Sequence, residues 1–178
     1  MFKLGCDGYT VCGYVGQLPL IYDSLVKHAR LHDDFGVKGN DGTALCVTVG
    51  RAGAKWPELV VTQRIDPGPE SGFFPGGLIV PDHQLVLIGG GTRLLAYDFA
   101  GPRRLWHDTA DTGFWGWSRH GDTILMSAEL EFAAWDSRGS KLWATFVEPP
   151  WDYEVHEGRV DLDVMGTRSS FDIRTGPK

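Results

Sequence analysis

The chain has 178 residues, of which 42% are hydrophobic and 22% charged, and its formal net charge is -6. This composition predicts one globular domain over residues 1–178 and excludes a disordered or collagen-like chain. No apolar run approaches the length of a membrane-spanning helix, so we expect no membrane partner. The acidic balance repels phosphate backbones, so we expect no nucleic-acid partner either.

The cysteines indicate the compartment. Cys6, Cys12 and Cys46 make an odd number in a domain of ordinary size, which argues against a disulfide framework and for a reducing environment. The N-terminus lacks the apolar segment of a secretory signal. We therefore expect a cytoplasmic protein.

Residues 1–42 are predicted to form a strand–helix segment that precedes β repeats over residues 43–178. The stretch Tyr9–Val15 is typical of a strand. Apolar residues at three- and four-residue spacing predict an amphipathic helix from Pro19 to His32, with proline in its first turn. A glycine-rich stretch over residues 36–42 then predicts a loop.

Two histidines on this helix suggest a metal site together with the first two cysteines. His28 and His32 are four residues apart and would share one helix face, where Cys6 and Cys12 could complete a zinc site. The cysteine spacing is longer than a zinc finger uses, and a core of this size needs no metal. We therefore favour free thiols and expect no cofactor, although the sequence does not decide whether the four side chains meet.

The second half of the chain contains an internal repeat. An aromatic residue followed by aspartate ends three apolar runs, and the aspartates are 38 and then 36 residues apart; the pairs are Tyr97-Asp98, Trp135-Asp136 and Phe171-Asp172. A glycine follows each pair, at Gly101, Gly139 and Gly176. Each unit predicts an antiparallel meander in which the aspartate accepts hydrogen bonds from turn amides. Apolar runs between residues 44 and 68 can supply a degenerate fourth unit.

These repeats resemble the blades of β-propeller proteins, in particular quinoprotein-like and WD-like repeats, over about residues 74 to 178. The resemblance implies a mainly β fold of antiparallel meanders, either an incomplete or irregular propeller or a two-layer sandwich, with one N-terminal helix. Closed propellers have at least four blades. The Gly-His pair of regular WD repeats is absent upstream of the Trp-Asp dipeptides, and quinone binding does not follow from a turn motif.

Acidic residues gather in one predicted hairpin. From Trp151 to Val164 apolar and charged residues alternate on both sides of Glu157-Gly158, which predicts a hairpin with one apolar and one charged face. This register places Asp152 opposite Asp163 and Glu154 opposite Asp161. Residues 145–163 hold six acids and one base, nearly the whole charge excess.

Three interpretations of this charged face compete. In the first, basic residues of neighbouring strands neutralise the face, or it is a solvated edge that discourages aggregation. In the second, the face docks a basic protein, since complementary charge speeds encounter and fixes orientation. In the third, its carboxylates hold a hard cation or act as acid and base in hydrolysis.

Tryptophans concentrate in the same region, with six of the seven between residues 106 and 151. Trp115 and Trp117 are two apart in a predicted strand, which would place them on one face, and Trp151 opens the acidic hairpin. Such aromatic residues either fill a core or form a hot spot for a partner.

Other motifs predict little chemistry. Gly116-Trp-Ser118-Arg-His120 lacks the final glycine of a nucleophile elbow and lies in a predicted strand and hairpin. Gly89-Gly-Gly-Thr92 lacks the lysine and helix of a phosphate loop, so it predicts a β-turn.

The sequence therefore favours a non-catalytic binding protein, such as an immunity or inhibitor protein, that docks a basic protein partner. The predicted binding residues are Asp152, Glu154, Asp161, Asp163, Trp115, Trp117 and Trp151. The alternatives are a small carboxylate- or metal-dependent hydrolase, and a structural β module that self-associates into a homo-oligomer.

Overall fold

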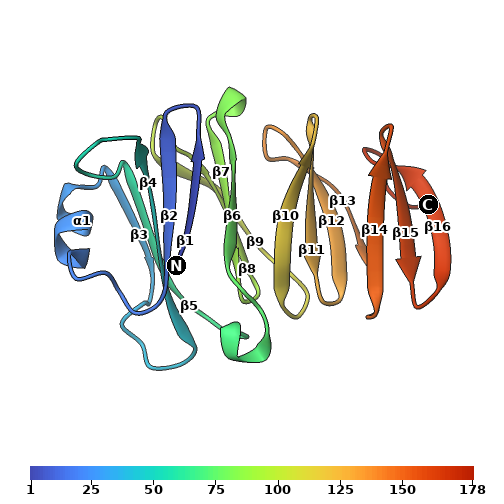
Figure 1. Cartoon of the computed structure of the whole chain (residues 1–178), viewed down its shortest axis with the longest axis horizontal. Coiled ribbons are helices and arrows are strands. Elements are labelled where there is room, and N and C mark those ends of the chain that lie inside the picture. The colour runs from blue at the N-terminus through green and yellow to red at the C-terminus, as the bar shows by residue number, and fades with distance from the viewer.

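The computed structural model describes all 178 residues and contains four β-sheets that follow one another in a row. The N-terminal sheet and the C-terminal sheet lie at opposite ends of the molecule, so the row is open (Figure 1). We number the sheets one to four from the N-terminus. The fold is mainly β with antiparallel meanders and one N-terminal helix, as the repeats predicted, and it has the irregular propeller-like arrangement instead of the two-layer sandwich.

Sheet one contains the expected fourth unit and is the least regular. Its strand order is β1-β2-β4-β5-β3, and only β3 pairs in parallel, with β5. The strands are β1 (Phe2–Cys6), β2 (Tyr9–Gly16), β3 (Leu31–Phe35), β4 (Thr43–Arg51) and β5 (Leu59–Ile65). The strand expected near Tyr9–Val15 is therefore confirmed.

The helix is shorter than predicted. Helix α1 covers Tyr22–His28, whereas the sequence indicated Pro19 to His32. The prediction of its end was wrong because Leu31 and His32 enter β3, where they pair with Leu59 and Val60 of β5. Local periodicity cannot show this long-range pairing. At seven residues, α1 is too short to cross a membrane.

The three remaining sheets are simple antiparallel meanders. Short 3-10 turns at Pro69–Ser71 and Pro81–His83 flank the first strand of sheet two. Sheet two contains β6 (Gly76–Val80), β7 (Leu85–Gly90), β8 (Arg93–Asp98) and β9 (Arg103–Thr109). Sheet three contains β10 (Phe114–His120), β11 (Thr123–Ala128), β12 (Glu131–Asp136) and β13 (Lys141–Phe146). Sheet four has only three strands, β14 (Trp151–His156), β15 (Arg159–Val164) and β16 (Thr167–Asp172).

The repeated aspartates act as predicted. Each carboxylate Oδ1 accepts two amide hydrogen bonds from the turn that follows the third strand of its sheet. The distances lie between 2.8 and 3.1 Å, from Asp98 to Ala100 and Gly101, from Asp136 to Arg138 and Ser140, and from Asp172 to Arg174 and Thr175. These turns repeat the same local geometry in sheets two, three and four.

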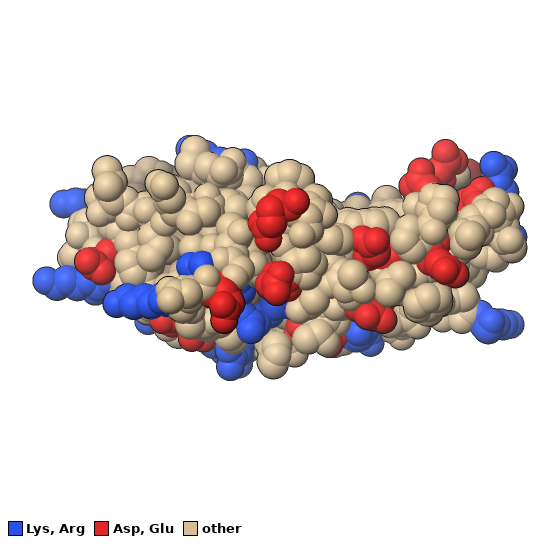
Figure 2. Space-filling view, turned by 90° about the horizontal axis from the view of Figure 1, so that it is seen from below, with Lys and Arg blue, Asp and Glu red and all other residues tan.

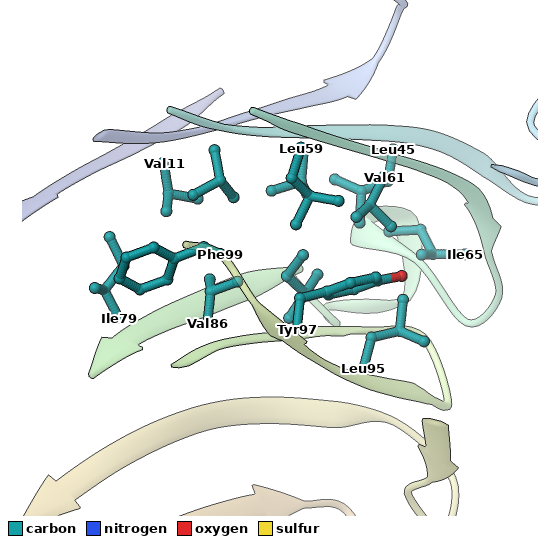
Figure 3. Packing of buried hydrophobic residues seen from close by; sticks show 13 residues of the cluster. Val11, Leu45, Leu59, Val61, Ile65, Ile79, Val86, Leu95, Tyr97 and Phe99 are labelled. Atoms are coloured by element: carbon teal, nitrogen blue, oxygen red, sulfur yellow. The ribbon is translucent and has the colours of Figure 1, made fainter. Parts of the chain in front are cut away.

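A hydrophobic layer fills each space between neighbouring sheets. The largest holds 13 buried residues between sheets one and two, where Leu59 and Val61 face Val86 and Tyr97 (Figure 3). A second layer of 12 buried residues joins sheets two and three, and a third of 9 joins sheets three and four. Burial of these faces, at about 25 cal/mol per Å², is the main force that holds the row together.

A tryptophan on the last strand of one sheet packs on the turn glycine of the next. Trp106 of β9 lies against Gly139, and Trp143 of β13 lies against Gly176. The Trp143 indole Nε1 also donates a 2.8 Å hydrogen bond to the Ile173 carbonyl. Both glycines have positive φ, +89° and +73°, which residues with a Cβ adopt only with strain. These contacts fix sheet two to sheet three and sheet three to sheet four.

The two ends of the row are covered differently. At the N-terminal end, α1 places Leu25 against Cys46 and Val60 on the outer face of sheet one. At the C-terminal end no element covers the outer face of sheet four, which instead carries charged residues (Figure 1).

Candidate binding face on the fourth sheet

The predicted hairpin register is confirmed. Strands β14 and β15 pair Asp152 with Asp163 and Glu154 with Asp161. Glu157 and Gly158 form the two-residue turn, with φ of 49° and 78°. Positive φ at both turn residues is the geometry that matches the right-handed twist of a hairpin. The alternating pattern of the sequence therefore sets which side chains face outward.

The outward side chains form what we call the acidic face: Asp152, Glu154, Asp161 and Asp163. On the other side of the same hairpin, Trp151, Val160 and Leu162 are buried against sheet three. Figure 2 shows acidic side chains over the C-terminal end of the molecule, with basic side chains beside them. An open groove of about 800 Å³ runs over this face between the side chains of β14, β15 and β16.

Basic residues neutralise the acidic face only in part. Arg168 of β16 pairs with Asp163 at 3.1 Å, and His156 contacts Glu154 at 3.0 Å. Arg159 donates to the Ser170 hydroxyl instead of a carboxylate. The carboxylates of Asp152 and Asp161 have no ion-pair partner in the structure. Part of the first interpretation therefore holds, but negative charge remains.

The hydrogen bond that the His156 ring donates to the Glu154 carboxylate raises the pKa of His156 above its ordinary value, and the nearby charges of Asp161 and Glu157 act in the same direction. The side chain is exposed, so solvent screens this effect. Protonation of His156 would reduce the negative charge of the face at mildly acidic pH.

One of the acids, Asp161, stands at a position that is an apolar contact elsewhere in the repeat. Aligned on the repeated aspartates, Asp161 of β15 corresponds to Leu87 of β7 and Leu125 of β11. Both leucines are fully buried against the following sheet. Arg168 of β16 likewise corresponds to the buried Leu94 and Phe132. On sheet four, charged side chains at Asp161 and Arg168 thus replace apolar side chains that are buried between sheets in the two preceding sheets.

The two tryptophans of β10 do not share one face, so that expectation was wrong. Trp117 packs on Trp135 and Phe114 between sheets two and three. Trp115 is 41% exposed and stacks on Trp151 at 5.2 Å on the other side. The register shifts between Phe114 and Gly116, so Trp115 occupies a β-bulge, and the extra residue turns it to the opposite face.

Trp151 packs between sheets three and four and also lines the groove. Its ring is mostly buried and contacts Phe132, and its indole Nε1 donates to the Glu129 carbonyl at 3.2 Å. Trp151 also lines the end of the groove over the acidic face. The structure therefore brings Trp115 and Trp151 together, with only Trp151 lining the groove, and places Trp117 in a separate layer.

The candidate zinc residues lie on four different elements. Cys6 is on β1, Cys12 on β2, His28 on α1 and His32 on β3. His28 stacks on Trp56 at 4.1 Å, whereas His32 bonds to the Thr62 hydroxyl at 3.0 Å. No group of three or more His, Cys, Asp or Glu side chains is placed to hold a metal ion.

Ser118 and His120 lie within hydrogen-bonding distance. The His120 Nε2 is 3.2 Å from the Ser118 Oγ, which is 2.8 Å from the Tyr153 hydroxyl of β14. Burial lowers the pKa of His120, which favours the neutral ring that can accept a proton. These contacts connect sheets three and four. Gly89-Gly-Gly-Thr92 forms the end of β7 and the turn to β8, as predicted.

Sequence reasoning missed the residues that β16 contributes. Arg168, Ser169 and Ser170 line the groove with the acids, and the basic and hydroxyl groups give it a mixed surface. The signal was available in the repeat, because Arg168-Ser169-Ser170 replaces Leu94-Leu95-Ala96 and Phe132-Ala133-Ala134 at the same distance before the aspartate.

No family model and no curated protein matches the chain. Among solved structures, the chain is similar to BamB from Moraxella catarrhalis, with a TM-score of 0.46 and 14% identity over 78% of this chain and 44% of that one. It is also similar to Hsv2 of Kluyveromyces marxianus, with a TM-score of 0.39 and 8% identity over 76% of this chain and 48% of that one. For Hsv2 of Kluyveromyces lactis the TM-score is 0.32, with 12% identity over 55% of this chain and 32% of that one. The chain therefore spans less than half the length of each of these structures.

Proposed function

We propose that the chain is a non-catalytic binding protein whose acidic face docks a basic protein, in the manner of an immunity or inhibitor protein. One observation carries the proposal: Asp161 occupies an inter-sheet position that is a buried leucine in the two preceding sheets. A sheet face that carries a carboxylate at such a packing position suits a protein partner whose lysine or arginine side chains pair with it.

The arrangement of the carboxylates defines the partner surface. The two cross-strand acid pairs are separated by two residues along each strand, or roughly 7 Å. Lysine or arginine side chains at that spacing would meet both pairs at once. Complementary charge would raise the association rate and fix the orientation of the complex, and salt would weaken both effects.

Aromatic residues at the groove end supply the apolar part of the proposed interface. Trp115 stacks on Trp151, which lines the groove, and 41% of the surface of Trp115 is exposed. Binding energy in protein interfaces concentrates in such aromatic anchors. We propose Trp115 as a direct contact, and Trp117 and Trp151 as side chains that hold β10 and β14 in place.

We also propose that residues 1–178 act as one domain and that the protein works in the cytoplasm. The carboxylates lie on an open surface, and no specific contact there favours the hydrolase over binding, so we do not advance catalysis as a second function.

The test is a variant in which all four acids become amides: Asp152→Asn, Glu154→Gln, Asp161→Asn and Asp163→Asn. A matched control carries Asp23→Asn, Asp41→Asn, Asp111→Asn and Asp122→Asn, which changes net charge by the same amount at exposed carboxylates with no side-chain ion pair. A partner is captured from the native cell, and its affinity for each chain is measured by titration at two salt concentrations.

We expect the face variant to lose at least tenfold in affinity and most of its salt dependence, while the control retains both. Equal affinity of the face variant and the wild-type chain would refute the proposal. A partner without basic surface would refute it as well.

A further inference from the structure

A polar hollow lies among turns of sheets two, three and four and shares no residue with the acidic face. Its volume is about 420 Å³, and none of its six lining residues is hydrophobic. A hollow of this size takes a small ligand, and its lining favours a charged one. The lining residues come from three sheets: His83 from sheet two, Asp122, Asp136, Ser137 and Arg138 from sheet three, and Arg174 from sheet four.

The two arginines of the hollow are the only ones in the chain whose guanidinium contacts neither a hydrogen-bond acceptor nor an aromatic ring. A guanidinium without a partner is available to an anion. Each of the other arginines has an ion pair, a hydrogen bond or a ring beneath it; they are Arg30, Arg51, Arg64, Arg93, Arg103, Arg104, Arg119, Arg159 and Arg168.

The repeated aspartate turns bring the two arginines to one hollow. Each arginine follows its turn aspartate by two residues, and its backbone amide donates to that carboxylate at 3.0 Å, Arg138 to Asp136 and Arg174 to Asp172. The contacts of tryptophan with the turn glycines fix these neighbouring turns to adjoining sheets. Sheet two carries Ala100 at the same turn position, so the turn itself does not require an arginine.

A buried hydroxyl also reaches the hollow. Ser137 is 5% exposed, lines the hollow and makes no hydrogen bond through its hydroxyl. The fully enclosed side-chain polar atoms without a partner belong to Gln63, Trp106 and Trp117, so the Ser137 oxygen is open to the hollow. An unpartnered polar group in so buried a residue is costly, and a bound acceptor would remove that cost.

Hydrogen bonds fix the turns around the hollow before any ligand arrives. Asp82 pairs with Arg119 of β10 at 3.0 Å, which holds the turn of His83 against sheet three. The Ser137 amide donates to the Asp122 carbonyl at 2.8 Å, which joins the two turns of sheet three. A site whose backbone is already held loses little conformational entropy on binding.

Two carboxylates line the hollow as well. Asp136 is engaged, because its Oδ1 accepts hydrogen bonds from the amides of Arg138 and Ser140. Asp122 is exposed, and its carboxylate has no partner. The donors without a partner are two guanidiniums and a hydroxyl, and they outnumber the one carboxylate that is wholly free. The hollow therefore suits an anion.

We propose that the hollow binds a phosphate group, either as inorganic phosphate or as the phosphate monoester of a small molecule. Guanidinium groups match the geometry of phosphate and can bond to it through two parallel N–H donors. The several oxygens of one phosphate can accept from Arg138, Arg174 and Ser137 together, whereas a carboxylate has only two oxygens for these donors. The proposal does not rest on the proposed function, because the two sites have no residue in common.

The first test is a nuclear magnetic resonance titration of the full chain, labelled with ¹⁵N, at constant ionic strength. Inorganic phosphate and glycerol phosphate are the two probes. The Ser137 amide and the Nε–H groups of Arg138 and Arg174 should show saturable shifts. Tighter binding of inorganic phosphate would assign the hollow to the free anion, and equal or tighter binding of glycerol phosphate would assign it to a monoester. The absence of saturable shifts with both probes would overturn the proposal, and so would shifts spread over basic residues of the whole surface.

The second test compares variants in the same titration. Arg138→Gln and Arg174→Gln should each weaken binding at least tenfold and keep the circular dichroism spectrum, because both side chains are exposed and make no contact that the fold uses. Arg51→Gln, the matched control, removes the same charge from an exposed arginine of sheet one and should leave affinity unchanged. Affinity in the two arginine variants equal to that of the control would overturn the proposal.

Asp122→Asn distinguishes an anion from other occupants of the hollow. The substitution keeps the shape of the side chain and removes a negative charge, so it should tighten phosphate binding at least threefold. Weaker binding of phosphate by Asp122→Asn would show that the hollow selects a cation or a hydrogen-bond donor, and would overturn the proposal.

Discussion

Gly176→Ala should destabilise the chain because it disrupts the contact between sheets three and four. A Cβ at Gly176 would lie 2.5 Å from Cγ and 2.8 Å from Cδ1 of Trp143. The indole cannot move away freely, since it donates to the Ile173 carbonyl at 2.8 Å and packs edge-on against Phe132 and Phe171. Overpacking of this kind costs about 1–3 kcal/mol.

The backbone contributes a second penalty, which a control can separate. Gly176 has a φ of +73°, where alanine is strained by about 1–2 kcal/mol. Gly158 has a φ of +78° and no atom within 4 Å of a Cβ built on it. Gly158→Ala therefore reports the backbone penalty alone, and we expect Gly176→Ala to exceed it by roughly 1–3 kcal/mol, or about 2–12 °C in Tm for a chain of this size.

Equilibrium unfolding in urea, with thermal unfolding beside it, measures both variants. A double-mutant cycle with Trp143→Ala should bring the effect of Gly176→Ala down to that of Gly158→Ala, because the clashing ring is gone. If Gly176→Ala costs no more than Gly158→Ala in the wild-type chain, the C-terminal turn yields to the ring and Trp143 does not fix sheet four.

Three further predictions concern single side chains. Burial raises the pKa of Cys46 to about 12, so a thiol reagent at pH 8 should label the exposed Cys6 in the native chain and leave Cys46 unmodified until the chain unfolds; rapid native labelling of Cys46 would contradict its burial. Burial lowers the pKa of His120 below its ordinary 6.5, so the unfolded chain binds that proton more tightly and the free energy of unfolding should fall as pH drops below 6.5. His120→Gln should weaken this pH dependence in urea titrations. An unchanged dependence of the unfolding free energy on pH would count against the role of His120. Trp117→Ala should cost about 3–5 kcal/mol because the ring fills the layer between sheets two and three, whereas Trp115→Ala should cost under half of that; similar losses in unfolding free energy would refute the different placement of the two rings.

The register of the acidic hairpin could be predicted from the sequence because every signal for it is local. Alternation with period two extends through both strands, and Glu157-Gly158 supplies a turn of defined length. Those two features determine the partner of each residue from Trp151 to Val164. The aspartate turns were predictable for the same reason, since each carboxylate bonds to amides two to four residues further along the chain.

Features that depend on distant strands could not be predicted. The helix ends early because Leu31 pairs with Leu59, and no spacing within residues 19–32 contains that information. Trp115 changes face because β10 bulges against β11, which two-residue periodicity cannot show. The partial neutralisation of the acids depends on Arg168, which the repeat brings next to Asp163 through β16.

The open row has a consequence for how the molecule unfolds. Each sheet packs only on its neighbours, so stability is a sum of nearest-neighbour contacts, as in a linear repeat array. Sheet four has a single neighbour and three strands, and amide protons there should exchange first in the native state. Any molecule that binds the acidic face would therefore slow amide exchange throughout sheet four in proportion to its occupancy.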